Sequence, residues 1–106
     1  MSMSRITQRD LERLCQRVNA AVNGERKDLA YDAEWPIWTR ENGTLRQIPN
    51  VYSISYAYGG AALHRNCDVD AAGESHGVHD VFGYHMPKRD LWERMQAFLR
   101  GVEVAS

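Results

Sequence analysis

Residues Val51 to Tyr58, VYSISYAY, give the clearest indication of the architecture of this chain. Large side chains alternate with small ones along it, and Gly59-Gly60 follows directly. A period of two, rich in aromatic and β-branched residues, predicts a strand with one large apolar face and one small, semi-polar face. The large face consists of Tyr52, Ile54, Tyr56 and Tyr58, and the small one of Val51, Ser53, Ser55 and Ala57.

Helical segments are predicted near both ends of the chain. Thr7 and Asp10 have the spacing of a capping box, and Gly24 stands where a left-handed C-cap belongs. Pro87 suits the first turn of the second helix. The apolar stripes are Leu11, Leu14, Cys15, Val18 and Val22 in the first helix, and Leu91, Trp92, Met95, Phe98, Leu99 and Val102 in the second.

Further strands flank the tyrosine-rich one. Residues 37–41 and 44–48 surround Asn42-Gly43, a dipeptide typical of type I′ hairpin turns. After the break at Pro49-Asn50, the tyrosine-rich strand continues this hairpin as the third strand of an antiparallel meander. Gly59-Gly60 is either a turn into a fourth strand at 61–65 or a bulge in one long strand. A surface loop at 66–77 and a short closing strand at 78–84 complete the sheet.

These elements predict a single α+β domain over residues 1–106. It has a small antiparallel meander of three to five strands, with the N-terminal and C-terminal helices packed on one face. That arrangement leaves the small face of the sheet either solvated or covered by another chain, which makes the domain a candidate for a homodimer or for binding a partner protein.

Composition narrows the range of functions. The chain has 106 residues and a formal net charge of −1, which predicts no strong attraction to nucleic acid or anionic membranes. No apolar run approaches the ~20 residues that cross a bilayer. The cysteines, Cys15 and Cys67, form no Cys-x-x-Cys pair, which indicates a reduced, cytoplasmic protein. No catalytic set is evident, because the chain lacks a nucleophile elbow and a phosphate-binding glycine loop.

The sharpest cluster of potential ligands is His64-x-x-Cys67 followed by His76-x-x-His79. Zinc prefers nitrogen and thiolate ligands in tetrahedral sets, and this spacing lets each pair point at one ion. A structural zinc site is therefore one hypothesis. The alternative is a polar surface loop that happens to be rich in histidine, in which case the chain has no cofactor.

A second hypothesis is nucleic-acid binding by the first helix. Arg9, Arg13 and Arg17 recur every four residues after Arg5, and such a stripe can follow a phosphate backbone. The alternative is a solvated helix face, because Asp10 and Glu12 dilute the positive charge. Lys88, Arg89 and Arg94 of the second helix strengthen the hypothesis only if they lie on the same side of the molecule.

Several motifs along the chain resemble a group of small proteins encoded by tailed phages and prophages. They are Tyr58-Gly59-Gly60, Leu63-x-Arg65, Gly77-Val78-x-Asp80-Val81-Phe82, Lys88-Arg89-Asp90-Leu91-Trp92 and Ala97-Phe98-x-x-Gly101. The resemblance implies a bacterial, virus-derived setting and carries over no catalytic residue.

The leading hypothesis is a small cytoplasmic accessory protein that acts by binding, most simply to a protein partner. The surfaces expected to bind are the Gly59-Gly60 region, an exposed Arg65, and the loop that carries Asp68 and Asp70.

Overall fold

The first helix begins and ends where its capping residues predict. In a computed structural model, which describes residues 5–24, 35–67 and 77–105, α1 spans Gln8–Asn23. Thr7 Oγ1 accepts a hydrogen bond from the Asp10 backbone N–H at 3.2 Å, and Asp10 accepts one from the Thr7 N–H at 2.8 Å. These bonds lower the pKa of Asp10 below its ordinary value of 3.8. Gly24 ends the helix with a positive φ of 86°, although its ψ of 155° is extended rather than left-handed.

Two hairpins follow, and both turn through residues with positive φ. Strands β1 (Trp38–Glu41) and β2 (Thr44–Gln47) pair antiparallel around Asn42-Gly43, with φ angles of 50° and 78°. Strands β3 (Tyr52–Ala57) and β4 (Gly60–Asn66) pair around Tyr58-Gly59, with φ angles of 55° and 72°. The Gly59-Gly60 region therefore reverses the chain, so of the two alternatives predicted from the sequence it is a turn and not a bulge.

The predicted α+β class is confirmed, but the strands form two sheets rather than one continuous meander. Strand β5 (Val78–Asp80) pairs with β4 and gives the order β3-β4-β5, while β1 and β2 form a sheet of their own. The chain breaks at Pro49-Asn50, where Asn50 has a φ of 64° and its N–H bonds to the Asn66 carbonyl. This corner sends β2 away from β3, so the two strands do not pair.

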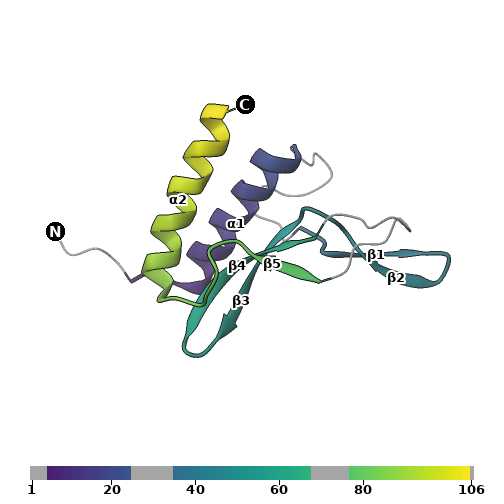
Figure 1. Ribbon diagram of the computed structural model, residues 1–106, viewed down its shortest axis with the longest axis horizontal. Helices are drawn as coiled ribbons and strands as arrows, with labels where there is room; N and C mark the ends of the chain where they lie inside the picture. Colours follow the sequence, from purple (N-terminus) through teal and green to yellow (C-terminus); the bar gives the residue numbers. More distant parts are fainter. Residues whose placement is uncertain (1–4, 25–34, 68–76, 106) are drawn as a thin grey trace.

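The β1–β2 hairpin projects from the rest of the molecule as an arm (Figure 1). Its base is fixed by the buried side chain of Asn66, which donates hydrogen bonds to the carbonyls of Ile37 and Ile48 at 3.2 and 2.7 Å. Trp38 and Leu45 lie on one face of the arm and are 50% and 55% exposed. The arm is therefore held at its base and presents apolar side chains to solvent.

Helix α2 (Lys88–Ala105) lies beside α1 and runs in the same direction, and both cover one face of the three-stranded sheet (Figure 1). Pro87 immediately precedes α2, and its carbonyl accepts the first helical hydrogen bond. The core forms between the helices and the sheet and consists of Leu11, Leu14, Cys15, Val18, Tyr52, Ala61, Leu63, Met86, Leu91, Met95 and Leu99. The predicted packing of both helices on one face is confirmed.

The tyrosine-rich strand presents its large face to α1 at three of the four predicted positions. Tyr52 is buried, Ile54 packs against the core, and the Tyr56 hydroxyl donates a hydrogen bond to Glu12 at 2.9 Å. Burial, and then this hydrogen bond, raise the pKa of Tyr56 well above its ordinary value of 10.0. Tyr58 differs, because it lies in the turn and is 95% exposed.

The opposite face of the sheet is not bare along its whole length. Residues 81–87 follow β5 and connect it to α2, and this connection pairs with β4 again at Met86, whose N–H and carbonyl both bond to Ala61. From this connection His85 reaches Ser55 on the small face of β3. The chain thus covers part of the face that the sequence leaves open to a partner.

Neither described helix is long and apolar enough to cross a membrane. The predicted loop at 66–77 lies mostly outside the described residues.

Candidate functional site

The turn between β3 and β4 holds an aromatic residue in an unfavourable backbone conformation. Tyr58 and Gly59 both have positive φ, which makes this two-residue connection a type I′ turn. Such turns prefer Asn-Gly, and the arm uses Asn42-Gly43 for the same purpose. A bulky side chain with positive φ is an outlier that costs about 1 kcal/mol. The Tyr58 side chain is 95% exposed, so core packing does not explain why tyrosine stands here.

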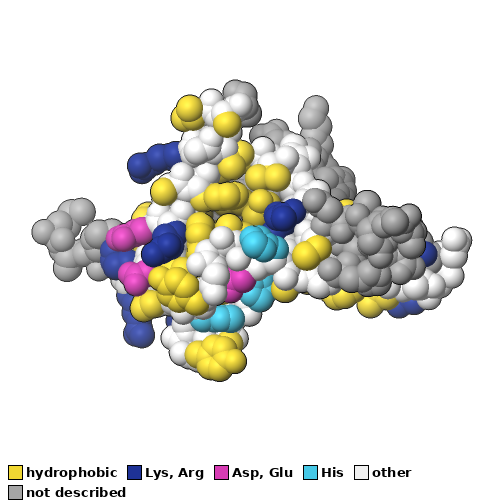
Figure 2. Space-filling view, viewed as in Figure 1, with side chains coloured by type: hydrophobic (Ala, Val, Ile, Leu, Met, Phe, Trp, Pro, Cys, Tyr) yellow, Lys and Arg dark blue, Asp and Glu magenta, His cyan; other side chains and the backbone are white. Residues whose placement is uncertain are grey.

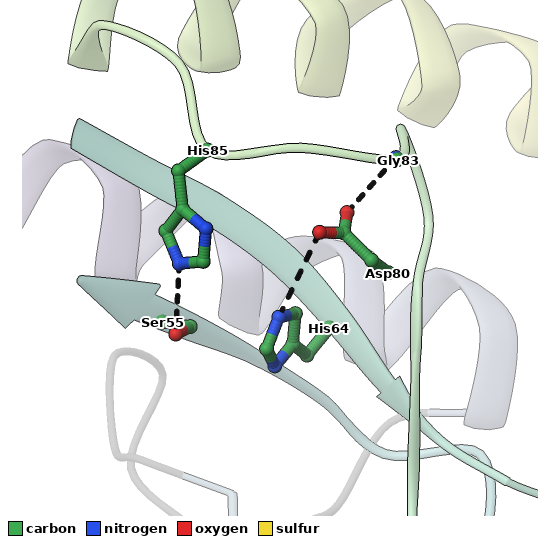
Figure 3. A network of polar contacts seen from close by, with 5 residues as sticks. All are labelled: Ser55, His64, Asp80, Gly83 and His85. Carbon is green, nitrogen blue, oxygen red and sulfur yellow. Dashed lines mark hydrogen bonds and ion pairs between the residues drawn. The ribbon is translucent and has the colours of Figure 1, made fainter. Parts of the chain in front are cut away.

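The His85 ring contacts the Tyr58 ring edge to face. The two ring centroids lie 5.6 Å apart, with 79° between the ring planes. His85 in turn shares a hydrogen bond with Ser55, with 3.1 Å between His85 Nε2 and Ser55 Oγ (Figure 3). A strand residue therefore fixes the imidazole that stands against Tyr58.

A second histidine lies beside the first, with a carboxylate nearby. The β4–β5 register pairs His64 with Asp80, and His64 Nε2 lies 3.9 Å from Asp80 Oδ2. The other carboxylate oxygen of Asp80 accepts a hydrogen bond from the Gly83 N–H at 3.0 Å (Figure 3). The His64 and His85 rings meet edge to face, with centroids 6.0 Å apart.

We call Tyr58, His64, Asp80 and His85 the tyrosine–histidine surface. In the space-filling view, histidine side chains gather beside a carboxylate on the face that carries β5 and the connection to α2 (Figure 2). Tyr84 follows the same connection, is 53% exposed, and its hydroxyl accepts a 3.4 Å hydrogen bond from Arg94 on α2. The surface thus combines exposed aromatic rings with polar groups that internal contacts hold in place.

The cluster contains a serine, histidines and a carboxylate, which are the groups of a nucleophilic site, but they do not contact one another in the sequence that such a site needs. A serine activated by histidine needs a carboxylate on the far side of that histidine to orient the imidazole. Within the described part of the chain, Asp80 pairs with His64 rather than with His85, the partner of Ser55. These contacts therefore position side chains at a surface, and they do not form a carboxylate–histidine–serine series that would activate Ser55.

The predicted binding residues are spread over different surroundings. Gly59 lies in the exposed turn next to Tyr58, whereas Gly60 faces the Met86 backbone so closely that a Cβ there would lie 2.6 Å from the Met86 carbonyl oxygen. Arg65 was expected to be exposed, but it is half-buried and donates a 2.7 Å hydrogen bond to the Asn50 side chain. Asp68 and Asp70 lie outside the described residues.

The histidine and cysteine residues of the zinc hypothesis do not converge where they are described. His64 pairs with Asp80 and the neighbouring Arg65 pairs with His79, so His64 and His79 point to opposite faces of the sheet. Over residues 5–24, 35–67 and 77–105, no three His, Cys, Asp or Glu side chains form a group that could hold a metal ion. His76 lies outside these ranges, and zinc binding stays a prediction.

The arginine stripe of the first helix is exposed. Exposure is expected both for a solvated helix face and for a nucleic-acid site, so it does not distinguish the two. Arg9, Arg13 and Arg17 are all exposed on α1. At the N-terminal ends of the two helices, Arg5, Lys88 and Arg89 line a shallow hollow of about 270 Å³ together with Gly59. Lys88 and Arg89 thus lie near the start of the first helix, whereas Arg94 lines a different hollow with Asp90 and Glu93. Neither hollow includes Arg9, Arg13 or Arg17, and nucleic-acid binding by the stripe stays a prediction.

Sequence reasoning missed Ser55 and His85 as partners and missed the role of Tyr58. One signal was present at Tyr58-Gly59, where tyrosine occupies a turn position that favours asparagine. No pattern in the sequence indicated the contact between Ser55 and His85, because the two residues are 30 positions apart.

Comparisons with models of protein families, with curated proteins and with solved structures found no match to this chain.

Proposed function

We propose that this chain is a binding module that holds a protein partner at the tyrosine–histidine surface. The observation that carries the proposal is Tyr58, which combines a positive φ of 55° with a side chain that is 95% exposed. Strained backbone concentrates at functional sites, where the strain positions a side chain. Since neither the turn nor the core needs tyrosine at this position, a surface role explains its presence.

The chemistry of the surface fits a protein partner. Tyrosine is enriched in protein interfaces because its rigid ring buries a large area with little loss of conformational entropy, and its hydroxyl still finds a hydrogen-bond partner. His85 and Ser55 hold the neighbouring groups before a partner arrives, which reduces the ordering cost of binding. The proposal places the chain in the cytoplasm of a bacterial host, as the resemblance of its motifs to small phage and prophage proteins implies. Cys15 and Cys67, both within the described residues, form no disulfide, which is consistent with that compartment.

Affinity capture with paired variants tests this function. Tagged protein is incubated with nuclease-treated bacterial lysate, and bound proteins are compared by mass spectrometry between the unmodified chain and Tyr58→Asn. Trp38→Asn is the matched control, because it replaces an exposed aromatic residue with asparagine on the arm. We expect one dominant partner that Tyr58→Asn loses at least about tenfold and Trp38→Asn retains, a difference of about 1.4 kcal/mol.

The opposite pattern would overturn the assignment. A partner lost only with Trp38→Asn would move the binding site to the arm, and a partner retained by both variants would exclude both surfaces.

Nucleic-acid binding is the second candidate, and the basic hollow at the ends of α1 and α2 favours it. Arg5, Lys88 and Arg89 face one hollow there. Phosphate contacts make affinity fall steeply as salt rises. We therefore expect labelled duplex DNA to bind at low salt and to be released by Lys88→Glu combined with Arg89→Glu, whereas Arg100→Glu at the far end of α2 leaves binding unchanged. DNA that fails to bind at low salt would remove this candidate.

A further inference from the structure

Strand β3 has an edge that pairs with no other described strand. Its partner on one side is β4, and the three-stranded sheet ends at β3 on the other side. Successive residues of a strand direct their backbone groups to alternate edges. Asn66 N–H bonds to the Val51 carbonyl, and β4 pairs Ser53 with His64, so Val51, Ser53 and Ser55 direct their backbone groups toward β4. The backbone groups of Tyr52, Ile54 and Tyr56 therefore point to the open edge.

The chain itself occupies the first position along this edge. The buried amide of Asn19 accepts a hydrogen bond from the Tyr52 N–H at 2.6 Å and donates one to the Tyr52 carbonyl at 2.9 Å. These are the two bonds that a residue of a neighbouring antiparallel strand would make. Asn19 thus stands in for one residue of a missing strand, and the next position along the edge is Ile54.

A hollow lies beside this position. Its volume is about 420 Å³, and its lining includes Glu12 and Gln16 of α1, Ile54 of β3, and the segment from Trp35 to Ile37. The Trp35 N–H bonds to the Gln16 side chain at 3.1 Å, which holds that segment against the helix. The edge is therefore flanked by a helix on one side and by a short chain segment on the other.

Natural sheets protect exposed edges with lysine, proline, bulges, very short strands, or a covering helix or loop. Asn19 of α1 covers the edge at Tyr52, but β3 itself carries none of the sequence features that discourage pairing. Strand β3 has the sequence YSISYA, pairs with β4 in unbroken register over six residues, and contains no charged residue or proline. An uncharged, regular edge beside an open hollow is suited to accept another strand.

We propose that the β3 edge binds a single extended peptide segment of another protein, which adds a strand at Ile54 and Tyr56. Recognition by strand addition uses main-chain hydrogen bonds for affinity and pockets for alternate side chains for specificity. Alternate side chains of the peptide enter the hollow between α1 and the segment 35–37, which offers apolar contacts from that segment and polar ones from Glu12, Gln16 and Ser53. A second copy of the chain fits less well, because its own β3 edge is flanked by the same helix and the same segment.

Nuclear magnetic resonance of the full chain tests the proposal with a defined probe. The probe is the blocked peptide acetyl-Thr-Val-Thr-Val-Thr-Val-Thr-amide. Two controls carry N-methyl groups on either its threonines or its valines, since only one alternate set of N–H groups can face β3. In the free chain we expect the Ile54 amide to exchange with solvent at least about tenfold faster than the Ser55 amide.

With the peptide we expect the Ile54 and Tyr56 amides to shift and the Ile54 amide to become protected. One N-methylated control should bind like the parent peptide, and the other should fail. The proposal is overturned if the Ile54 amide is already as protected as that of Ser55 in the free chain, or if no edge amide shifts at about 1 mM peptide. It is also overturned if sedimentation shows a dimer whose dissociation exposes the Ile54 amide.

Discussion

At the scale of single residues, Asn19 determines how α1 sits against the sheet. Its side chain is fully buried and satisfies both the N–H and the carbonyl of Tyr52. Replacing it with alanine leaves these buried groups without partners, and each unsatisfied group costs about 1–3 kcal/mol.

We therefore expect Asn19→Ala to lower the free energy of unfolding by about 3 kcal/mol in urea titration. Asn23→Ala is the matched control on the same helix, because the Asn23 amide donates to the Asn50 carbonyl at an exposed site. Its cost should stay near 0.5 kcal/mol. Equal losses in the two variants would show that burial of the Asn19 amide has no special role.

Asp10 makes the stability of α1 depend on pH. Its hydrogen bonds with Thr7 lower its pKa in the folded chain below the ordinary 3.8. A carboxyl with a lowered folded-state pKa contributes stability that is fully present above the unfolded-state pKa. That contribution is lost as the pH falls below 3.8 through the folded-state value.

Asp10→Asn should therefore be less stable than the unmodified chain at pH 7, with the difference shrinking as the pH falls below 3.8. Thermal unfolding followed by circular dichroism between neutral and acidic pH measures both curves. A difference that stayed constant over that range would assign the loss to something other than the charge of Asp10. Asp90→Asn is the control variant, because it removes a carboxylate from the first turn of the other helix, α2.

At the scale of elements, the connection between β5 and α2 depends on a glycine. A Cβ on Gly60 would lie 2.6 Å from the Met86 carbonyl oxygen, in the place where Met86 and Ala61 exchange backbone hydrogen bonds. Gly101 in α2 is the opposite case, because a Cβ there would meet no atom of the described residues within 4 Å beyond the backbone of its own helix and its chain neighbours.

The same substitution should therefore have opposite effects at the two sites. We expect Gly60→Ala to destabilise the fold by about 1–3 kcal/mol, because the Met86 backbone must move. We expect Gly101→Ala to stabilise it by about 0.5–1 kcal/mol through higher helix propensity. Chemical denaturation of both variants checks the pair, and a stable Gly60→Ala would show that the 81–87 connection is free to shift.

Local signals in the sequence were sufficient for most elements. The capping box at Thr7, the Asn42-Gly43 turn and most of both apolar stripes depend on residues a few positions apart and are confirmed. The last stripe positions of each helix are the exception, because Val22 is exposed and Val102 does not belong to the core. The division into two sheets could not be read in this way. It depends on the corner at Asn50, whose N–H bonds to the Asn66 carbonyl, and on the Asn66 side chain, which reaches the carbonyls of Ile37 and Ile48 across the fold.

At the scale of the whole molecule, two unrelated segments build the candidate site. Tyr58 comes from the hairpin turn and His85 from the connection to α2, and their rings meet because Met86 pairs back onto Ala61. The sequence singled out Gly59 and Gly60 but not this pairing, since it depends on where the chain returns to β4. The arm and the β3 edge leave two further surfaces available around the same small core.

If Tyr58 serves the binding surface and not the fold, replacing it should cost no stability, and the free energy of unfolding of Tyr58→Asn measures this. Asparagine suits the type I′ turn, as Asn42 does in the arm, while the exposed edge contact with His85 buries little area. We predict that Tyr58→Asn unfolds at higher urea, with a gain of about 0.5–1 kcal/mol, and that the reciprocal Asn42→Tyr loses a similar amount. A Tyr58→Asn chain that is less stable than the unmodified protein would contradict the account, because tyrosine would then be required by the fold itself.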